Sequence, residues 1–188
     1  KIMWARLLET LLHEPPKPQP ARPSAGAPSF SLEQILHGVR EKQFEPFFQP
    51  KVGLASGLVL GAEALARWRH PAHGLVGPNA FIAPLEQSGK IDDLTLLMLE
   101  KAAGACSAWR ERGLELTVSV NLSLVSLADT MLANRITDTV RSAGLDPRYM
   151  ILEITETAAM TEVAPALENL ARLRMRGFGL SVDDYGTG

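Results

Sequence analysis

Cysteine is almost missing from the chain, since Cys106 is the only one among 188 residues. A single cysteine excludes an internal disulfide framework and a zinc site built on cysteines, and it favours a reducing compartment, so we expect a cytoplasmic protein. The chain also lacks an excess of charge of one sign, because 19 Lys and Arg stand against 21 Asp and Glu, a formal net charge of −2. This balance gives no general reason to expect DNA or RNA binding.

Long apolar runs are missing as well. The most apolar stretch, residues 54–66, is interrupted by Ser56, Glu63 and several glycines, so it does not predict a membrane span of about 20 apolar residues. What is present is 46% hydrophobic and 21% charged residues. This composition is typical of a globular domain with one substantial core.

The first 29 residues differ from the rest. Residues 1–13 carry apolar side chains spaced as on one face of a short helix, which we interpret as the end of an upstream module: Ile2, Met3, Leu7, Leu8, Leu11 and Leu12. Residues 14–29 hold six prolines, a composition typical of a semi-extended linker. A new domain is expected over 30–188, because Ser31 and Gln34 have the spacing of a capping box at a helix start.

Strand-like and helix-like patterns alternate through this domain. Strands are predicted at 46–52, where Pro50 suggests an edge position, and at 58–68. Helices are predicted at 79–87, 92–112, 129–143 and 162–176, the last three ending at Gly113, Gly144 and Gly177. Such alternation predicts a parallel sheet with helical crossovers, either a doubly wound sheet or a (β/α)₈ barrel.

Four apolar runs end on side chains that carry oxygen. Glu63, Asn121 and Glu153 each close one run, and the adjacent pair Asp183 and Asp184 closes the fourth. Both candidate folds place their active sites at the carboxyl ends of strands, so we expect these oxygens at one common end. Carboxylate and amide oxygens suit hard divalent cations such as Mg²⁺ or Mn²⁺.

Two adjacent aspartates could hold two divalent metal ions side by side. Two such ions promote in-line displacement at phosphorus. Arg67 and Arg69 follow Glu63 closely enough that at least one of them could bind a phosphate. Each residue alone also has a plainer interpretation. Asn121 could satisfy backbone groups at a strand end, Glu153 and Glu156 could be a solvated pair, and Asp183 with Asp184 could form an ordinary turn. The residues alone therefore indicate phosphodiester chemistry at a divalent site and leave the substrate open.

Four motifs of the chain, taken in order, resemble those of the EAL-domain cyclic-di-GMP phosphodiesterases: Glu63-Ala64-Leu65-Ala66-Arg67, Ser119-Val120-Asn121-Leu122-Ser123, Leu152-Glu153-Ile154-Thr155-Glu156 and Asp183-Asp184-Tyr185-Gly186-Thr187-Gly188. The resemblance covers about 30–188. It implies a TIM-like (β/α)₈ barrel with an antiparallel first strand, here its N-terminal five strands or so. It also implies metal-dependent hydrolysis of cyclic di-GMP to linear pGpG.

The resemblance further implies a role for individual residues. The metal ligands, for two Mg²⁺ or Mn²⁺ ions, would be Glu63, Asn121, Glu153, Asp183 and Asp184, of which Glu63, Asp183 and Asp184 count as catalytic. Gln49 and Arg67 match positions that contact the substrate. Glu156 matches the glutamate that anchors the loop beginning at Asp183, and Tyr185 stands where phenylalanine is commoner.

Several implied features lie outside this sequence. The general-base lysine and a further metal-binding glutamate are expected beyond Gly188, so the domain is expected to be cut at the Asp-Asp-Tyr-Gly-Thr-Gly loop. The N-terminal helix and linker resemble the junction after a receiver domain in a two-component response regulator, and the family implies a homodimer or higher oligomer. The alternative function is a non-catalytic cyclic-di-GMP receptor, or a signalling scaffold, with the same fold.

Overall fold

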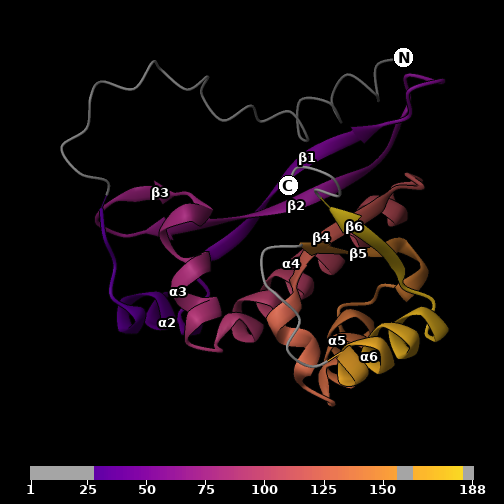
Figure 1. Ribbon diagram of the computed structural model, residues 1–188. Helices are drawn as coiled ribbons and strands as arrows, with labels where there is room; N and C mark the ends of the chain where they lie inside the picture. The colour runs from indigo at the N-terminus through magenta and orange to yellow at the C-terminus, as the bar shows by residue number, and fades with distance from the viewer. Residues whose placement is uncertain (1–27, 156–162, 184–188) are drawn as a thin grey trace.

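The computed structural model describes residues 28–155 and 163–183 of the chain. The helix predicted over 1–13 and nearly all of the linker predicted over 14–29 lie outside the described residues, as do Glu156, Asp184 and Tyr185. The predicted domain is therefore described from just before its first helix to the end of its last strand (Figure 1).

The described residues form a mixed sheet of six strands. These are β1 (Phe44–Val52), β2 (Val59–His70), β3 (Gly74–Val76), β4 (Thr117–Ser123), β5 (Met150–Thr155) and β6 (Gly179–Asp183). The order is β1-β2-β4-β5-β6, with β3 paired to β2. Pairing is antiparallel between β1 and β2 and between β2 and β3, and parallel from β2 through β6. The antiparallel first strand is confirmed, and within the described part of the chain β1 is an edge strand, as Pro50 suggested.

Helices connect the parallel strands. They are α2 (Leu32–Arg40), α3 (Ile82–Gln87), α4 (Ile91–Glu111), α5 (Leu132–Ser142) and α6 (Val163–Met175), with short 3₁₀ turns η1 (Pro78–Ala80), η2 (Leu124–Ala128) and η3 (Pro147–Tyr149). Helix α4 packs on β4 and β1, and α5 packs on α4 and on α6. Figure 1 shows α4, α5 and α6 together on one side of the strands. Among the described helices, none has the length and apolar character needed to cross a membrane.

Local sequence signals set several helix ends. The Ser31 hydroxyl accepts a hydrogen bond from the Gln34 backbone N–H, and the Gln34 side chain accepts one from the Ser31 backbone N–H, which confirms the capping box. Gly113 and Gly144 have a φ of 80° after α4 and α5, a conformation that glycine adopts without a steric cost. The helix predicted at 79–87 is interrupted at Phe81, whose backbone (φ −136°, ψ −23°) is not helical. The buried Phe81 ring packs edge-on against Phe44 there.

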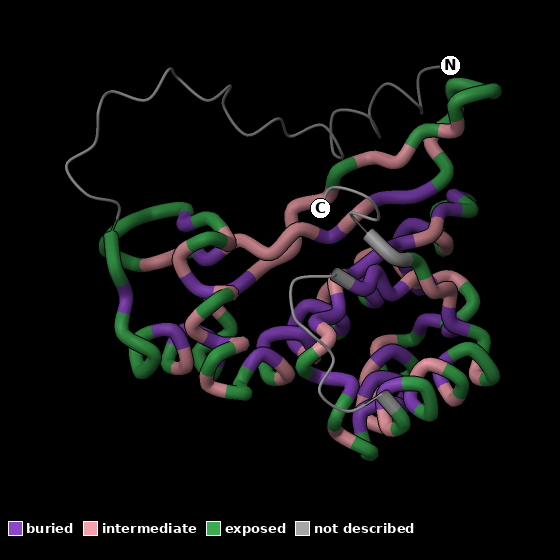
Figure 2. Tube along the Cα trace, viewed as in Figure 1, coloured by how far each residue is buried: buried purple, intermediate pink, exposed green. Residues whose placement is uncertain are grey.

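The core lies between the sheet and the helices. Figure 2 shows buried residues concentrated along α4 and on the strands beside it. At the β1–β2 end of the core, the Trp68 ring stacks on Phe44 with ring centroids 5.1 Å apart, and its indole N–H donates to Gln43. The side of the sheet that faces the helices is thus filled with apolar side chains.

Candidate active site at the strand ends

Three predicted ligands come together from three neighbouring strands. Strand register places Ser119 beside Glu63 and places Asn121 beside Glu153. Because strand side chains alternate between faces, Asn121 shares a face with Ser119 and so with Glu63. The Asn121 side-chain amide donates a hydrogen bond of 3.0 Å to Glu63 Oε1. The expectation that Glu63, Asn121 and Glu153 meet at one end of the sheet agrees with this geometry.

Strand β1 brings two further polar residues to the same place. Gln49, a predicted substrate contact, is the register partner of Glu63. Lys51 lies two residues further along β1, and its ammonium forms an ion pair with Glu153 Oε1 and lies 4.0 Å from Glu63 Oε2. Lys51 was not among the site residues predicted from the sequence. The available signal was its spacing, because a residue two positions after Gln49 on a strand shares its face.

The site is largely withdrawn from water. The side chain of Glu153 is 6% exposed and that of Glu63 is 19% exposed, whereas Lys51 is 41% exposed. Burial of a carboxylate is costly unless a cation or hydrogen-bond donors compensate it. Two buried carboxylates here share one ammonium group, which leaves the cluster with an excess of negative charge.

The oxygens of this cluster fit a hard divalent cation. Asn121 Oδ1 is buried and has no hydrogen-bond partner among the described residues. Since the Asn121 amide nitrogen is held by Glu63, the unpartnered oxygen belongs to a side chain of fixed orientation. Two carboxylates and one amide oxygen are the donors that Mg²⁺ and Mn²⁺ prefer. Within the residues described, no three His, Cys, Asp or Glu side chains gather at one point, so these three donors do not by themselves form a closed cage.

The fourth predicted strand end lies beside the third. Glu153 is the register partner of Ser181, and the Asp183 backbone pairs with Thr155 at the end of β6. Asp183 lies two residues beyond Ser181, at the last position of β6. Asp184 and Glu156 follow β6 and β5 outside the described residues.

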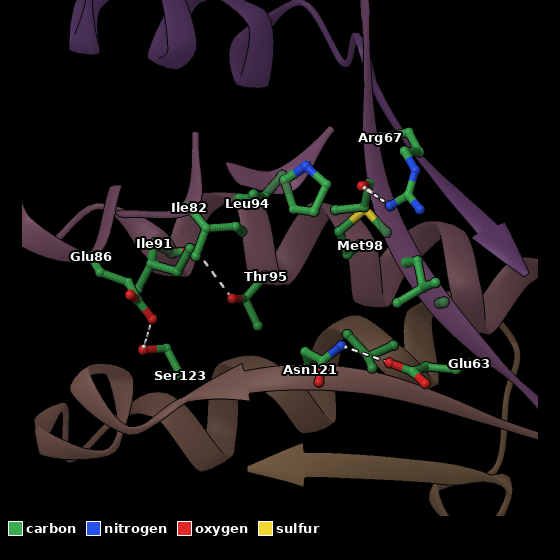
Figure 3. A pocket seen from close by; sticks show the side chains of 15 residues that line it. Glu63, Arg67, Ile82, Glu86, Ile91, Leu94, Thr95, Met98, Asn121 and Ser123 are labelled. Carbon is green, nitrogen blue, oxygen red and sulfur yellow. Dashed lines mark hydrogen bonds between the residues drawn. The ribbon is translucent and has the colours of Figure 1, made fainter. Parts of the chain in front are cut away.

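A cavity of about 360 Å³ adjoins the cluster. It opens where the β2–β4 ladder ends at the pair Ala64 and Val120, after which the two strands separate. Its wall contains Glu63, Asn121 and Arg67 together with apolar side chains of α3 and α4 (Figure 3). Arg67 donates to the Ala66 carbonyl at 2.8 Å and lines the cavity, and its contact with a phosphate stays a prediction.

The far side of this cavity holds a polar pair that sequence reasoning did not identify. The Ser123 hydroxyl donates to Glu86 on α3 at 2.6 Å and accepts from the Val125 backbone N–H (Figure 3). Ser123 thereby ties the end of β4, two residues beyond Asn121, to α3 and to the following turn. A serine two residues after a candidate ligand on the same strand was the only sequence signal for it.

The EAL domain family matches residues 32–188 of the chain. The chain belongs to the EAL domain family. The bifunctional diguanylate cyclase/cyclic di-GMP phosphodiesterase MucR of Pseudomonas aeruginosa is 35% identical over 160 residues, which cover 82% of this chain and 23% of MucR. The cyclic di-GMP phosphodiesterase RocR of the same organism is 34% identical over 158 residues, which cover 84% of this chain and 40% of RocR. The chain thus spans well under half the length of these relatives.

Solved structures agree with this assignment. The EAL domain resembles the structure named "PaMucR Phosphodiesterase, c-di-GMP complex" with a TM-score of 0.74 and 34% identity, over 82% of this chain and 65% of that one. The EAL enzyme Bd1971 in its form with cAMP and cyclic di-GMP bound also has a TM-score of 0.74, with 31% identity over 84% of this chain and 44% of that one. The described strands and helices are therefore part of a TIM-like barrel, as predicted.

Proposed function

We propose that this EAL domain chain hydrolyses cyclic di-GMP to linear pGpG in bacterial second-messenger signalling in the cytoplasm, with Mg²⁺ or Mn²⁺ as cofactor. The observation that carries the proposal is the oxygen cluster of Glu63, Asn121 and Glu153, built on adjacent parallel strand ends beside a cavity. The relatives named as cyclic di-GMP phosphodiesterases support the choice of substrate. In this reaction a water oxygen bonds to phosphorus and one phosphodiester P–O bond breaks, which opens the ring.

The chain's own residues would divide the work between holding ions and holding substrate. Glu63, Asn121, Glu153 and Asp183 would hold the cofactor, with Asp184 at a second ion. Divalent ions supply an activated water and stabilise charge on the phosphoryl oxygens. Asn121 supports this role because its amide nitrogen is engaged by Glu63 and its oxygen is free within the described structure.

Substrate contacts are proposed for Gln49 and Arg67. Arg67 lines the same cavity as Glu63, and its planar guanidinium suits a phosphate oxygen pair. Gln49 lies directly across from Glu63 on β1. We further propose that Glu156 anchors the loop after Asp183, that the domain acts as a homodimer or higher oligomer, and that residues 1–13 and 14–29 link it to a receiver-like domain.

A hydrolysis assay tests the proposal. The full-length protein is incubated with cyclic di-GMP and Mn²⁺ or Mg²⁺, and pGpG is measured by liquid chromatography. Release of pGpG is expected for the wild type and is expected to vanish in Glu63→Ala. The matched control is Glu100→Ala, which removes an exposed carboxylate whose partner is the surface residue Lys42. Unchanged turnover in Glu63→Ala refutes the assignment of the site.

The same preparation distinguishes the receptor alternative. Equilibrium dialysis with cyclic di-GMP measures binding independently of hydrolysis. Binding without pGpG release, in the presence of either ion, contradicts the enzymatic proposal and supports a receptor with the same fold.

A further inference from the structure

Lys51 stands out because it contacts the two carboxylates that the proposed function assigns to the cofactor. Its ammonium is ion-paired with Glu153 Oε1 and lies 4.0 Å from Glu63 Oε2. Within the described part of the chain, it is the one cation paired with either carboxylate. The Lys51 ammonium therefore compensates part of the negative charge of the two carboxylates.

The three side chains differ in how easily they can move away. Glu153 and Glu63 extend from inner strands and are mostly buried, with 6% and 19% of their side chains exposed. Lys51 extends from the edge strand β1 and is 41% exposed, so its flexible four-carbon stem has a path to solvent. Next to Lys51 the β1–β2 register shifts between Lys51 and Val52. The carboxylates are thus fixed and the ammonium is the component that can leave.

We propose that Lys51 is a built-in competitor of the divalent cation. In the absence of metal the Lys51 ammonium binds the same carboxylate oxygens that the ion requires, and the ion displaces it on binding. This inference rests on the metal site of the proposed function. It assigns Lys51 a specific effect, which is to lower the affinity of the site for cations.

The charge of a cation determines whether it can displace the Lys51 ammonium from the two carboxylates. A monovalent ion brings no more charge to Glu63 and Glu153 than the ammonium it must displace, whereas a divalent ion brings twice as much. Since the interaction energy of charges scales with their product, displacement favours the divalent ion. Lys51 therefore lowers the affinity of the site for every cation, so that a monovalent ion gains little by displacing the ammonium whereas a divalent ion still binds.

Metal binding, measured without turnover, tests the inference. The full-length wild type, Lys51→Met and the surface control Lys42→Met are titrated with Mn²⁺, and free Mn²⁺ is measured by electron paramagnetic resonance. Lys42 pairs with Glu100 in an exposed salt bridge and takes no part in the site. We expect Lys51→Met to bind Mn²⁺ about tenfold more tightly, Lys42→Met to match the wild type, and Lys51→Arg, which keeps the charge, to stay near the wild-type affinity.

The outcomes separate this inference from the proposed function. If the wild type binds Mn²⁺ and Lys51→Met binds it equally or more weakly, Lys51 preorganises the carboxylates and the competitor role is overturned. If neither protein binds Mn²⁺, both the competitor role and the metal dependence of the proposed function are overturned. Circular dichroism checks the fold, and Lys51→Gln replaces Lys51→Met in the same titration should the methionine variant fail to fold.

Discussion

Replacement of Asn121 by aspartate tests the electrostatics of the strand-end cluster most directly. In the wild type the Asn121 amide donates to Glu63 Oε1 at 3.0 Å. Asn121→Asp keeps the shape of the side chain, replaces the donor nitrogen by an oxygen and adds a negative charge. The favourable hydrogen bond becomes a repulsive contact between two carboxylates. A third carboxylate, the buried Glu153, lies beside residue 121 on the neighbouring strand.

The separation of these atoms sets the size of the effect. Two unit charges 3.0 Å apart repel by about 1.4 kcal/mol at the dielectric constant of water and by about 5.5 kcal/mol at an effective dielectric constant of 20. The Glu63 side chain is 19% exposed, which places the pair between these limits, and the Lys51 ammonium offsets part of the repulsion. We expect the metal-free protein to lose about 3 kcal/mol of unfolding free energy.

Urea unfolding with and without Mn²⁺ measures this loss. Asn121→Leu is the matched control, since it removes the hydrogen bond and adds no charge, and we expect it to lose about 1 to 2 kcal/mol. Mn²⁺ should restore stability to Asn121→Asp more than to Asn121→Leu, because the added carboxylate is a further ligand for a hard cation. If metal-free Asn121→Asp is as stable as the wild type, or no less stable than Asn121→Leu, the added carboxylate does not repel Glu63.

Two further predictions concern the core. A Cβ at Gly38 would lie 2.7 Å from Trp68 Nε1, so Gly38→Ala should lose about 1 to 2 kcal/mol of unfolding free energy in urea, although alanine has the better helix propensity. The control Gly104→Ala, which places its Cβ in open space on α4, should gain up to about 1 kcal/mol. A stabilised Gly38→Ala would contradict the close packing of Gly38 on Trp68. Burial raises the pKa of the Cys106 thiol to about 11, so native protein at pH 8 should react far more slowly with a disulfide reagent than protein in urea. Rapid labelling of the native protein would be evidence against a buried Cys106. The stability due to the raised pKa of this thiol is fully present below pH 9 and is lost as the pH rises toward 11.

Features that depend on neighbouring residues in the sequence could be predicted. The Ser31 capping box and the helix stop at Gly113 each involve a few consecutive residues and are confirmed. The order of strands and helices followed from hydrophobic periodicity, and the meeting of Glu63, Asn121 and Glu153 followed from the rule that parallel strands end at a common edge. Local chemistry and this one topological rule were sufficient for the centre of the candidate site.

Features that depend on contacts between distant residues could not be predicted. Strand β3 has only three residues, too few to show a strand pattern in the sequence. It is recognised by its pairing with the end of β2. The ion pair of Lys51 and Glu153 joins residues 102 positions apart, and the hydrogen bond of Ser123 and Glu86 joins residues 37 apart. The ring contact of Phe81 with Phe44 likewise joins two distant segments of the chain. In each case the partner is set by tertiary structure.

The antiparallel pairing of β1 and β2 has a consequence for how this domain tolerates change in length. Gln49 and Lys51 face the site, whereas Phe48 packs its ring against Trp109 on the opposite face. An insertion of one residue within β1 would exchange these faces and bury polar groups among aromatic ones. The turn at 53–58 is exposed at nearly every position, and added residues there leave the pairing intact. Insertions or grafted peptides should therefore be accepted in the turn and rejected a few residues earlier.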